Sequence, residues 1–314
     1  MKKIMVIGSF MMDLVVRTPK APREGETIIG YSFSQFTGGK GANQAVAAAR
    51  LGADVTMLGK VGDDNFGDAQ IQSLKEAGVN IDYIMRDPHS STGIGFITLE
   101  SNGKNRIIIV PGVNMLFSVH ELKEHEELIS RSDVIILQLE IPIETVYAAI
   151  DMGYKFKKTI ILNPSPYTKI DRNYLSKIDY LILNEVEARD FTGVNVVDSK
   201  MVNAAGNKLL DMGCKNVVIT MGDKGILFLN GREQFYVDSI RVDAIDTTAA
   251  GDEFIGAFAY GLSNGFDHVQ CTRFANAAAA ISVTKMGAQQ SLPGLDELKN
   301  FITDNKIDIG GVKL

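Results

Sequence analysis

A run of small residues leads into an aspartate at Asp246-Thr247-Thr248-Ala249-Ala250-Gly251-Asp252, and an apolar, helix-compatible segment follows. The first backbone N–H groups of a helix have no partner inside it, and residues as small as Ala249, Ala250 and Gly251 leave them open to an anion. Asp252 then lies beside the anion, placed to accept a proton. This arrangement suits phosphoryl transfer to a hydroxyl group. A simple turn with a helix N-cap is the alternative interpretation.

A second glycine-rich loop opens a helix at Gly38-Gly39-Lys40-Gly41-Ala42-Asn43-Gln44-Ala45. Three glycines in four residues permit a tight backbone and the close approach of a ligand. Lys40 and Asn43 supply polar groups at this loop, although a solvated surface lysine is the alternative interpretation of Lys40. The loop is not a Walker A loop, because it contains no Gly-Lys-Ser/Thr sequence. Two such loops in one chain favour a ligand site over two unrelated turns.

Short apolar runs alternate with longer amphipathic segments. The predicted strands are Ile4–Ile7, Val55–Lys60, Val134–Leu137, Thr159–Leu162, Tyr180–Leu183, Val217–Thr220 and Ile226–Leu229. The predicted helices are Ala42–Leu51, Asn65–Ala77, Ser118–Ser130, Ile143–Met152, Glu185–Phe191, Lys200–Met212, Ala250–Leu262, Val269–Lys285 and Leu295–Asp304. Continuous apolar strands separated by helices are typical of a mostly parallel sheet covered on both faces. We therefore predict one α/β domain over residues 1–314.

Two regions break this alternation, at Leu14–Phe36 and Thr92–Val110. Both are rich in β-branched and alternating residues, with glycine and proline between them. They predict a small sheet that lies outside the main one. Exposed strand edges need cover, so dimerisation through this sheet is physically reasonable.

Several polar residues follow the predicted strands at the points where those strands end. They are Asp13, Glu140, Asn163, Asn184, Glu187, Thr220 and Gly222. In open parallel sheets, ligands bind beyond the carboxyl ends of the strands. The sequence therefore predicts that these residues converge on one binding site.

Composition excludes several classes of function. The chain has 314 residues and a net charge of −6, so nucleic acid is not an expected partner. Its two cysteines and four histidines show no spacing that indicates a disulfide scaffold or a zinc site. No apolar stretch approaches the roughly 18 residues of a membrane span. We expect a cytoplasmic protein that does not bind membranes.

At these residues the chain resembles the ribokinase family of sugar kinases, the phosphofructokinase-B type. The matching segments occur in the family's order and spacing over nearly the whole chain. They are Gly8–Asp13, Gly25-Glu26-Thr27, Gly38–Ala45, Gly62-Asp63-Asp64, Pro111–Asn114, Gln138-Leu139-Glu140, Asn163-Pro164, Asn184–Glu187, Thr220–Gly225, Asp246–Asp252 and Gly287-Ala288-Gln289. The resemblance implies a ribokinase-like, Rossmann-type sheet with helices on both faces and a small β-sheet lid. It also implies a homodimer in which two lids clasp.

The resemblance implies an ATP-dependent pentose kinase that phosphorylates a primary sugar hydroxyl. Asp252 would be the general base, and the N–H groups of Ala249, Ala250 and Gly251 would stabilise the transferred phosphoryl group. The residues that match the family's sugar-binding positions are Asp13, Gly39, Lys40, Asn43 and Glu140. Carboxylates suit this task because each accepts two donated hydrogen bonds. For Glu140, a cap at a strand end is the alternative.

For the nucleotide, the resemblance assigns Thr220, Gly222, Gly225 and Gly251, with Asn276 near the adenine. Asn276 is also explained as a polar residue tolerated in an alanine-rich helix. Asn184 and Glu187 match a motif that positions phosphate and the water shell of Mg²⁺. A helix N-cap with a capping-box glutamate explains the same pair, and both interpretations can hold at once.

Members of the family are activated by a monovalent cation such as K⁺, which carbonyl oxygens largely hold. The matching positions here are Asp246, Thr248, Ser282, Lys285, Gly287 and Ser291. The residues themselves do not show that a cation binds, so K⁺ is an expectation from the resemblance.

The segment after the first strand departs from ribokinases in one position. Ribokinases usually read Gly-Ser-x-Asn-x-Asp there, and the asparagine contacts the sugar; this chain has Met11 at that position. A thioether cannot replace an amide as a hydrogen-bonding group. A sugar that lacks one hydroxyl fits this change, and the pattern is similar to the deoxyribokinases of the family. The alternative is that Met11 fills a gap and ribose is still preferred.

Other functions stay open at this stage. A nucleoside or hexose kinase uses the same fold, and fold does not determine function. A catalytically inactive sugar sensor is a further possibility, which the intact Asp252 loop disfavours. A dehydrogenase is disfavoured because Gly93-Ile94-Gly95 lies in the predicted lid and has no strand–turn–helix context.

Overall fold

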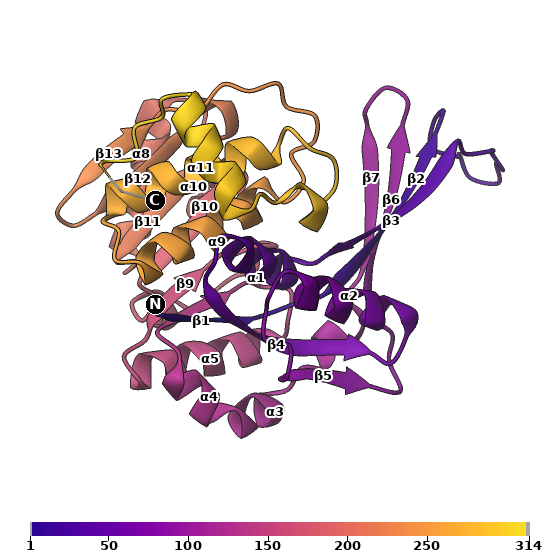
Figure 1. Ribbon diagram of the computed structural model, residues 1–314, viewed down its shortest axis with the longest axis horizontal. Helices are drawn as coiled ribbons and strands as arrows, with labels where there is room; N and C mark the ends of the chain where they lie inside the picture. Colours follow the sequence, from indigo (N-terminus) through magenta and orange to yellow (C-terminus); the bar gives the residue numbers. More distant parts are fainter. Residues whose placement is uncertain (1, 312–314) are drawn as a thin grey trace.

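The computed structural model describes residues 2–311 and contains one large sheet, one small sheet and flanking helices (Figure 1). The large sheet has nine strands in the order β13-β12-β11-β10-β9-β8-β1-β4-β5. Their bounds are β1 Lys3–Ile7, β4 Asp54–Gly62, β5 Ile84–Asp87, β8 Val134–Leu137, β9 Thr159–Leu162, β10 Tyr180–Asn184, β11 Asn216–Thr220, β12 Ile226–Asn230 and β13 Gln234–Val237. All neighbouring strands pair in parallel except β11 with β12 and β12 with β13, so only β12 runs in the opposite direction, and this confirms the predicted mostly parallel α/β fold.

Helices cover both faces of this sheet. One face packs against α1 Lys40–Arg50, α2 Asn65–Glu76, α9 Ala250–Ser263, α10 His268–Ser282 and α11 Leu295–Asp304. The other packs against α3 Val119–Glu124, α4 Glu126–Arg131, α5 Ile143–Lys155, α6 Arg172–Leu175, α7 Glu185–Thr192 and α8 Ser199–Asp211. Strand β1 shows why both faces are covered: Ile4 and Val6 enter the first core, and Met5 and Ile7 enter the second.

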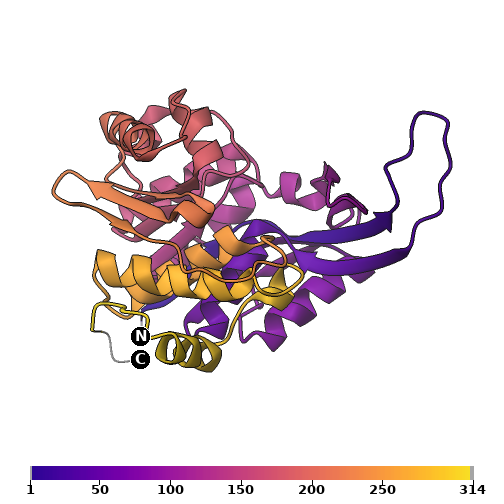
Figure 2. The ribbon, with the colours of Figure 1, turned by 90° about the horizontal axis from the view of Figure 1, so that it is seen from above.

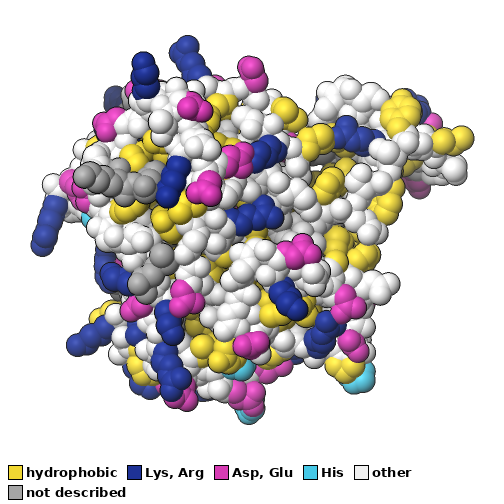
Figure 3. All heavy atoms as spheres, viewed as in Figure 1, with side chains coloured by type: hydrophobic (Ala, Val, Ile, Leu, Met, Phe, Trp, Pro, Cys, Tyr) yellow, Lys and Arg dark blue, Asp and Glu magenta, His cyan; other side chains and the backbone are white. Residues whose placement is uncertain are grey.

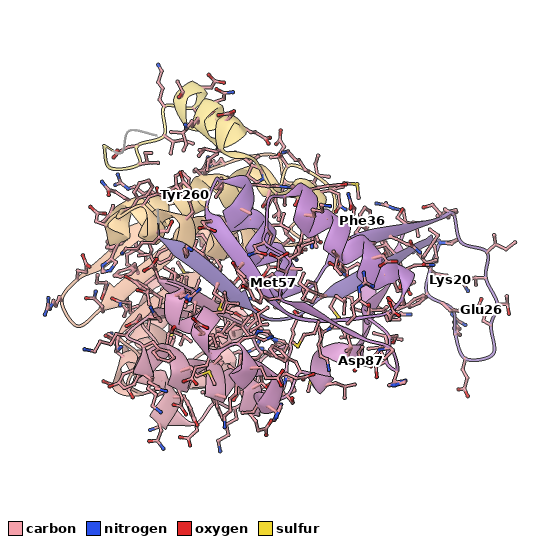
Figure 4. The ribbon with its side chains drawn as sticks, turned by 60° about the horizontal axis from the view of Figure 1, so that its bottom comes forward. Lys20, Glu26, Phe36, Met57, Asp87 and Tyr260 are labelled. Atoms are coloured by element: carbon pink, nitrogen blue, oxygen red, sulfur yellow. The ribbon has the colours of Figure 1, made fainter. Side chains whose placement is uncertain are left out.

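The small sheet stands away from the main body (Figure 1). Its strands, in the order β3-β2-β6-β7, are β2 Met11–Thr18, β3 Ser32–Gly38, β6 Gly93–Glu100 and β7 Asn105–Val110. The connection between β2 and β3 extends beyond the sheet, as Figure 2 shows, and an ion pair between Lys20 and Glu26 braces it (Figure 4). β2 begins at Met11 rather than at the predicted Leu14, so Met11 and Asp13 belong to the small sheet itself.

Two further details differ from the prediction. The helix predicted at Ser118–Ser130 is divided into α3 and α4 at His125, whose ring packs edge-on against Tyr83 with centroids 5.7 Å apart. Short 3₁₀ helices lie at η1 Gly112–Leu116, η2 Gly222–Lys224 and η3 Gln289–Ser291.

Within residues 2–311, no helix is long and apolar enough to cross a membrane.

Candidate active site

Helix α9 begins without a side-chain cap. Its N-cap residue is Ala249, which adopts a left-handed conformation with φ of 61° and makes no capping hydrogen bond through its side chain. A left-handed alanine is strained, so the surrounding structure must hold it there. The helix therefore presents the open N–H groups that favour an anion. Asp252 lies inside the first turn and is not the N-cap, so the simple capping interpretation of this aspartate is wrong.

The Asp252 carboxylate is buried and held by two side-chain amides of α1. Asn43 Nδ2 donates to Oδ2 at 2.9 Å, and Gln44 Nε2 donates to Oδ1 at 2.9 Å. Helices α1 and α9 approach closely because Gly256 faces α1, where an added Cβ would lie 2.4 Å from the Cβ of Ala47. This contact brings the two glycine-rich loops of the sequence together.

The start of α1 is joined to β2 and to Glu140. Gly39 has φ of 91°, and an added Cβ would lie 2.6 Å from the backbone N of Met11, so only glycine fits there. Glu140 accepts a hydrogen bond from the backbone N–H of Lys40 at 3.0 Å and another from the hydroxyl of Ser9. Glu140 thus caps the start of α1, and its carboxylate faces the loop that holds Lys40.

Met11 and Asp13 lie two residues apart on β2, so their side chains share one face of the small sheet. Glycines surround them on the neighbouring strands. A Cβ at Gly93 would lie 2.5 Å from Met11 Sδ, and Cβ atoms at Gly38 and Gly95 would lie 2.8 and 2.7 Å from the Asp13 carboxylate oxygens. The glycines therefore leave room for these two side chains beside the start of α1.

Three carboxylates and one lysine gather at this point. Burial, and then the negative charges of Glu140 and Asp252, raise the pKa of Asp13 to about 7. Burial also raises the pKa of Glu140, against the effect of Lys40. Burial opposes the charged form of Lys40, but the charges of Asp252, Glu140 and Glu187 outweigh it and raise its pKa. Lys40 is therefore a cation among carboxylates and not a solvated surface lysine.

A pocket opens beside Asp252 at the carboxyl ends of the strands. Its lining includes Lys40, Asn163, Asn184, Glu187, Thr220, Ala249, Gly251 and Asp252. Asn184 caps α7 by accepting from the N–H of Glu187 at 2.9 Å, and Glu187 accepts from the N–H of Asn184 at 3.0 Å. The capping box expected as one interpretation is therefore formed, while both side chains still line the pocket.

A larger cavity of about 650 Å³ adjoins the first and shares Thr220 and Gly251 with it. The predicted nucleotide residues Gly222, Gly225 and Asn276 line this cavity. Asn276 Nδ2 donates to the backbone oxygen of Asp238 at 2.9 Å. Gly251 lines both spaces and Ala250 lines the larger one, so the open start of α9 lies between the small polar pocket and a space of ligand size.

The residues expected at a cation site form two joined loops. Asp246 accepts from the N–H of Thr248 at 2.9 Å and from the N–H of Gly287 at 3.0 Å. Partial burial acts against it, but these hydrogen bonds lower the pKa of Asp246, so its carboxylate is ionised. Ser282 and Ser291 donate their hydroxyls to nearby carbonyls, and Lys285 pairs with Glu297 at 2.6 Å.

Carbonyl oxygens are hard ligands, so they can bind a cation at a site that contains no cluster of carboxylates. Asp246 joins the two loops through the N–H of Gly287, while Ser282, Ser291 and Lys285 are engaged by other partners, so backbone oxygens would be the ligands for a cation here. The small sheet contacts them as well: a Cβ at Gly287 would meet the ring of Phe36 at 3.3 Å, and Figure 4 shows where Phe36 lies. Across residues 2–311, no group of three or more His, Cys, Asp or Glu side chains is arranged to hold a metal ion.

Two buried amides at this site, Gln44 and Gln138, received no role from the sequence, and a third, Asn163, was predicted only to converge on the site. Gln44 and Gln138 hydrogen-bond to each other at 2.6 Å, and Asn163 lies 3.4 Å from Gln44. All three lie inside the motifs that carry the family resemblance, and for Gln44 and Gln138 this was the only feature of the sequence that pointed to a role. Their function depends on the direction in which each amide points, and a sequence does not encode this locally.

The sequence and the structure of this chain are both similar to those of known carbohydrate kinases. The pfkB family carbohydrate kinases match residues 1–295. A deoxyribokinase from Salmonella typhi is 40% identical over 304 residues, which are 96% of this chain and 99% of that protein. A ribokinase from Schizosaccharomyces pombe is 41% identical over 310 residues, which are 95% and 97% of the two chains. The structure of Arabidopsis thaliana ribokinase complexed with ribose and ATP superimposes with a TM-score of 0.92 at 32% identity, covering 96% of this chain and 98% of that one.

Proposed function

Because the chain belongs to the pfkB family of carbohydrate kinases, we propose that it is a pentose kinase. It transfers the γ-phosphate of ATP to the primary O5 hydroxyl of 2-deoxy-D-ribose or D-ribose. The observation that most supports this function is the position of Asp252. It lies in the first turn of a helix without a side-chain cap, where a small polar pocket meets a larger cavity. Relatives named deoxyribokinase and ribokinase support the substrate class.

The proposed mechanism uses positioning and electrostatics, which dominate phosphoryl transfer. Asp252 removes the proton of the sugar hydroxyl as the hydroxyl oxygen attacks the γ-phosphorus of ATP. The bond between that phosphorus and the β–γ bridging oxygen breaks, and ADP leaves. The N–H groups at the start of α9 stabilise the charge on the transferred group. Lys40, a cation on the lining of the same pocket, adds a positive charge. Asp13, Asn43 and Glu140 hold the sugar through its other hydroxyls.

The nucleotide occupies the larger cavity, with Thr220, Gly222 and Gly225 beside its phosphates and Asn276 towards its base. Mg²⁺, when bound with the nucleotide, would neutralise phosphate charge, and Glu187 would hold its water shell. Backbone oxygens of the loops that Asp246 joins would hold K⁺, which would supply a fixed positive charge near the start of α9. The structure of a relative complexed with ribose and ATP supports the nucleotide assignment, and the link between the two loops through Asp246 and Gly287 supports the place proposed for the monovalent cation.

Identification of the product tests this function directly. The purified protein is incubated with ATP, Mg²⁺, K⁺ and each pentose, and the product is examined by ³¹P and ¹³C NMR. We expect a phosphate ester at C5 and a loss of turnover when Mg²⁺ is omitted or K⁺ is replaced by a bulky organic cation. An ester at another carbon, or ATP hydrolysis without a sugar phosphate, would disprove the proposal.

Met11 favours 2-deoxyribose over ribose as the preferred pentose. Its thioether lies on the same sheet face as Asp13 and is only 5% exposed. The sulfur cannot donate and is only a weak acceptor, and Asn114 Nδ2 already lies 3.8 Å from it, so an added hydroxyl at that point is desolvated with little compensation. Apolar pockets reject an extra hydroxyl only weakly, by about 10²-fold, so ribose is a slower substrate rather than an excluded one. A ribokinase proper, or another sugar or nucleoside kinase, is the alternative.

Replacing Met11 by asparagine should shift preference towards ribose. The amide restores a donor and an acceptor beside the sugar, so the ratio of kcat/KM for deoxyribose to that for ribose should fall about 10-fold or more. Met12 provides the control, because Met12→Leu alters a buried neighbour that points to the opposite face of β2. A ratio that is the same in Met11→Asn and in the wild type removes Met11 from the explanation of specificity.

We further propose that residues 1–314 form one kinase domain whose small sheet is a lid and a dimer interface. Every residue of β7 is exposed, and apolar side chains gather on this projecting sheet (Figure 3). They include Phe33, Phe96, Ile107, Ile108 and Ile109. Such a bare strand edge is unusual in a monomer. Sedimentation should show a dimer for the wild type and a monomer for Ile108→Lys; a monomeric wild type would refute the interface.

A further inference from the structure

Behind the proposed general base lies a chain of buried side-chain amides. Gln44 and Gln138 have exposed fractions of 0% and 1%, although both carry polar groups. Gln138 lies just after β8 and Gln44 lies in α1, so two separate elements contribute. Neither side chain lines the pocket beside Asp252. Their polar groups are instead explained by the hydrogen bonds that they make inside the protein.

The hydrogen bonds determine which way each amide points. Gln138 Nε2 donates to Gln44 Oε1 at 2.6 Å, so the oxygen end of Gln44 faces Gln138. The NH₂ end of Gln44 must then face Asp252, and it donates to Oδ1 at 2.9 Å. Asn163 supports the same orientation, because its own NH₂ donates to the backbone oxygen of Ile182 and its oxygen faces Gln44 Nε2 at 3.4 Å.

Gln138 uses only the NH₂ end of its side-chain amide for a hydrogen bond within the described residues. Its Oε1 is buried and has no hydrogen-bond partner among the described residues. A buried amide oxygen without a partner costs free energy, which an apolar side chain of the same size would avoid. The NH₂ group directed at Gln44 is therefore the part that the site uses. Gly8 makes room for this amide, since an added Cβ would lie 1.9 Å from Gln138 Oε1.

We propose that Gln138 and Gln44 are positioning residues that orient the Asp252 carboxylate for proton removal from the sugar. Gln138 sets the direction in which the Gln44 amide points. Gln44 then holds one oxygen of the Asp252 carboxylate, and Asn43 holds the other. We call the pair Gln138 and Gln44 the amide relay. Each carboxylate oxygen accepts about two hydrogen bonds, so a lone pair stays available to the sugar hydroxyl. Because these hydrogen bonds already fix the carboxylate, no conformational entropy has to be lost to orient it when the sugar hydroxyl reacts. The inference rests on the proposed role of Asp252 as the base.

Substitution by methionine removes each amide at nearly constant volume. We expect Gln44→Met to lower kcat about 10- to 100-fold, the range for losing one hydrogen bond to a charged group. We expect Gln138→Met to lower kcat about 10-fold, because Gln44 can then rotate its oxygen towards Asp252. In both variants KM for the sugar should stay within about 2-fold, since the sugar contacts are intact. An unchanged kcat, or a loss carried by KM, overturns the proposal.

The double variant tests whether Gln138 acts through Gln44. If it does, Gln138→Met should have no further effect on kcat once Gln44 is methionine, so the two losses are not additive. Multiplicative losses would show that the two residues act independently and would overturn the relay. Thr145→Val is the matched control for stability. It deletes a buried hydrogen bond to the oxygen of Phe117 on the opposite face of the sheet, and its kcat should equal that of the wild type.

Gln138→Glu supplies a readout that a purely structural role would not change. When protonated, the new carboxyl donates to Gln44 Oε1 as the amide does. When ionised, it repels that oxygen and favours the reversed amide. The kcat of this variant relative to the wild type should therefore fall as pH rises through the titration of the glutamate. A ratio that does not change with pH overturns the proposal.

The same experiments separate a failure of this inference from a failure of the proposed function. Turnover of the two pentoses by the wild type tests the function. The ratio of variant to wild-type kcat tests the relay with whichever sugar the wild type phosphorylates. A protein that phosphorylates a hexose with an intact relay effect would refute the pentose assignment alone.

Discussion

Asp252→Asn should lower kcat about 10³-fold while the protein remains folded, because a general base contributes roughly 10²- to 10⁴-fold to such reactions. The asparagine cannot accept the sugar proton. It also presents an NH₂ group where Asn43 and Gln44 both direct donors, so one of those hydrogen bonds is lost. The start of α9 and the sugar contacts are otherwise unchanged, so KM should rise much less than kcat falls.

The adjacent carboxyl provides the control for this variant. Glu253→Gln makes the same chemical change one residue along the same helix turn, at a side chain that does not line the pocket. It should keep a kcat within about 3-fold of the wild type. Steady-state kinetics on both variants gives the comparison. An Asp252→Asn protein with a kcat within 10-fold of the wild type would mean that another group takes the proton.

Glu253→Gln should instead stabilise the protein at neutral and alkaline pH. The Glu253 side chain is fully buried, and neither carboxyl oxygen has a hydrogen-bond partner among the described residues. Burial raises its pKa from 4.5 to about 8, although the charges of Arg50 and Lys285 act in the opposite direction. The folded protein therefore keeps a proton that the unfolded chain releases. Glutamine has nearly the same shape and needs no proton.

The pH range of this gain follows from the two pKa values. Below about pH 4.5 both states are protonated, so Glu253 imposes no cost relative to glutamine. Between pH 4.5 and about 8 the folded state binds more protons than the unfolded state, so wild-type stability falls as pH rises. The gain from Glu253→Gln should grow over this range and reach the order of 5 kcal/mol above pH 8. Urea unfolding of both proteins from pH 5 to 9 measures it. A gain that is constant with pH would show that Glu253 is ionised in the fold.

The sequence was sufficient for the interior of the fold. Every strand predicted from a continuous apolar run is present, because strands buried on both faces carry that pattern wherever they lie. The strands that it missed, β5 and β13, form the two edges of the large sheet. Their residues are mostly half-buried or exposed, and their apolar runs are only two residues long in β5 and three in β13, which is too short to recognise. β2 was predicted to begin too late because Met11 and Asp13 pair with glycines, which carry no strand signal.

The glycine-rich loops were visible in the sequence as sites of close backbone approach, and the structure brings both to Asp252. Lys40 and Glu140 were predicted to lie together through the family resemblance, but the hydrogen bond from Lys40 N–H to Glu140 was not. The amide relay was also beyond prediction. Gln44 and Gln138 are 94 residues apart in the chain, and the orientation of an amide depends on every partner around it.

We propose that this chain phosphorylates a pentose and that Met11 favours the sugar with one hydroxyl fewer. The most direct measurement is kcat/KM for 2-deoxyribose and for ribose, with ATP, Mg²⁺ and K⁺ present. We predict turnover of both sugars with a ratio in favour of deoxyribose, up to about 10²-fold. A ratio in favour of ribose would contradict the role given to Met11. Turnover of neither sugar would contradict the pentose assignment itself.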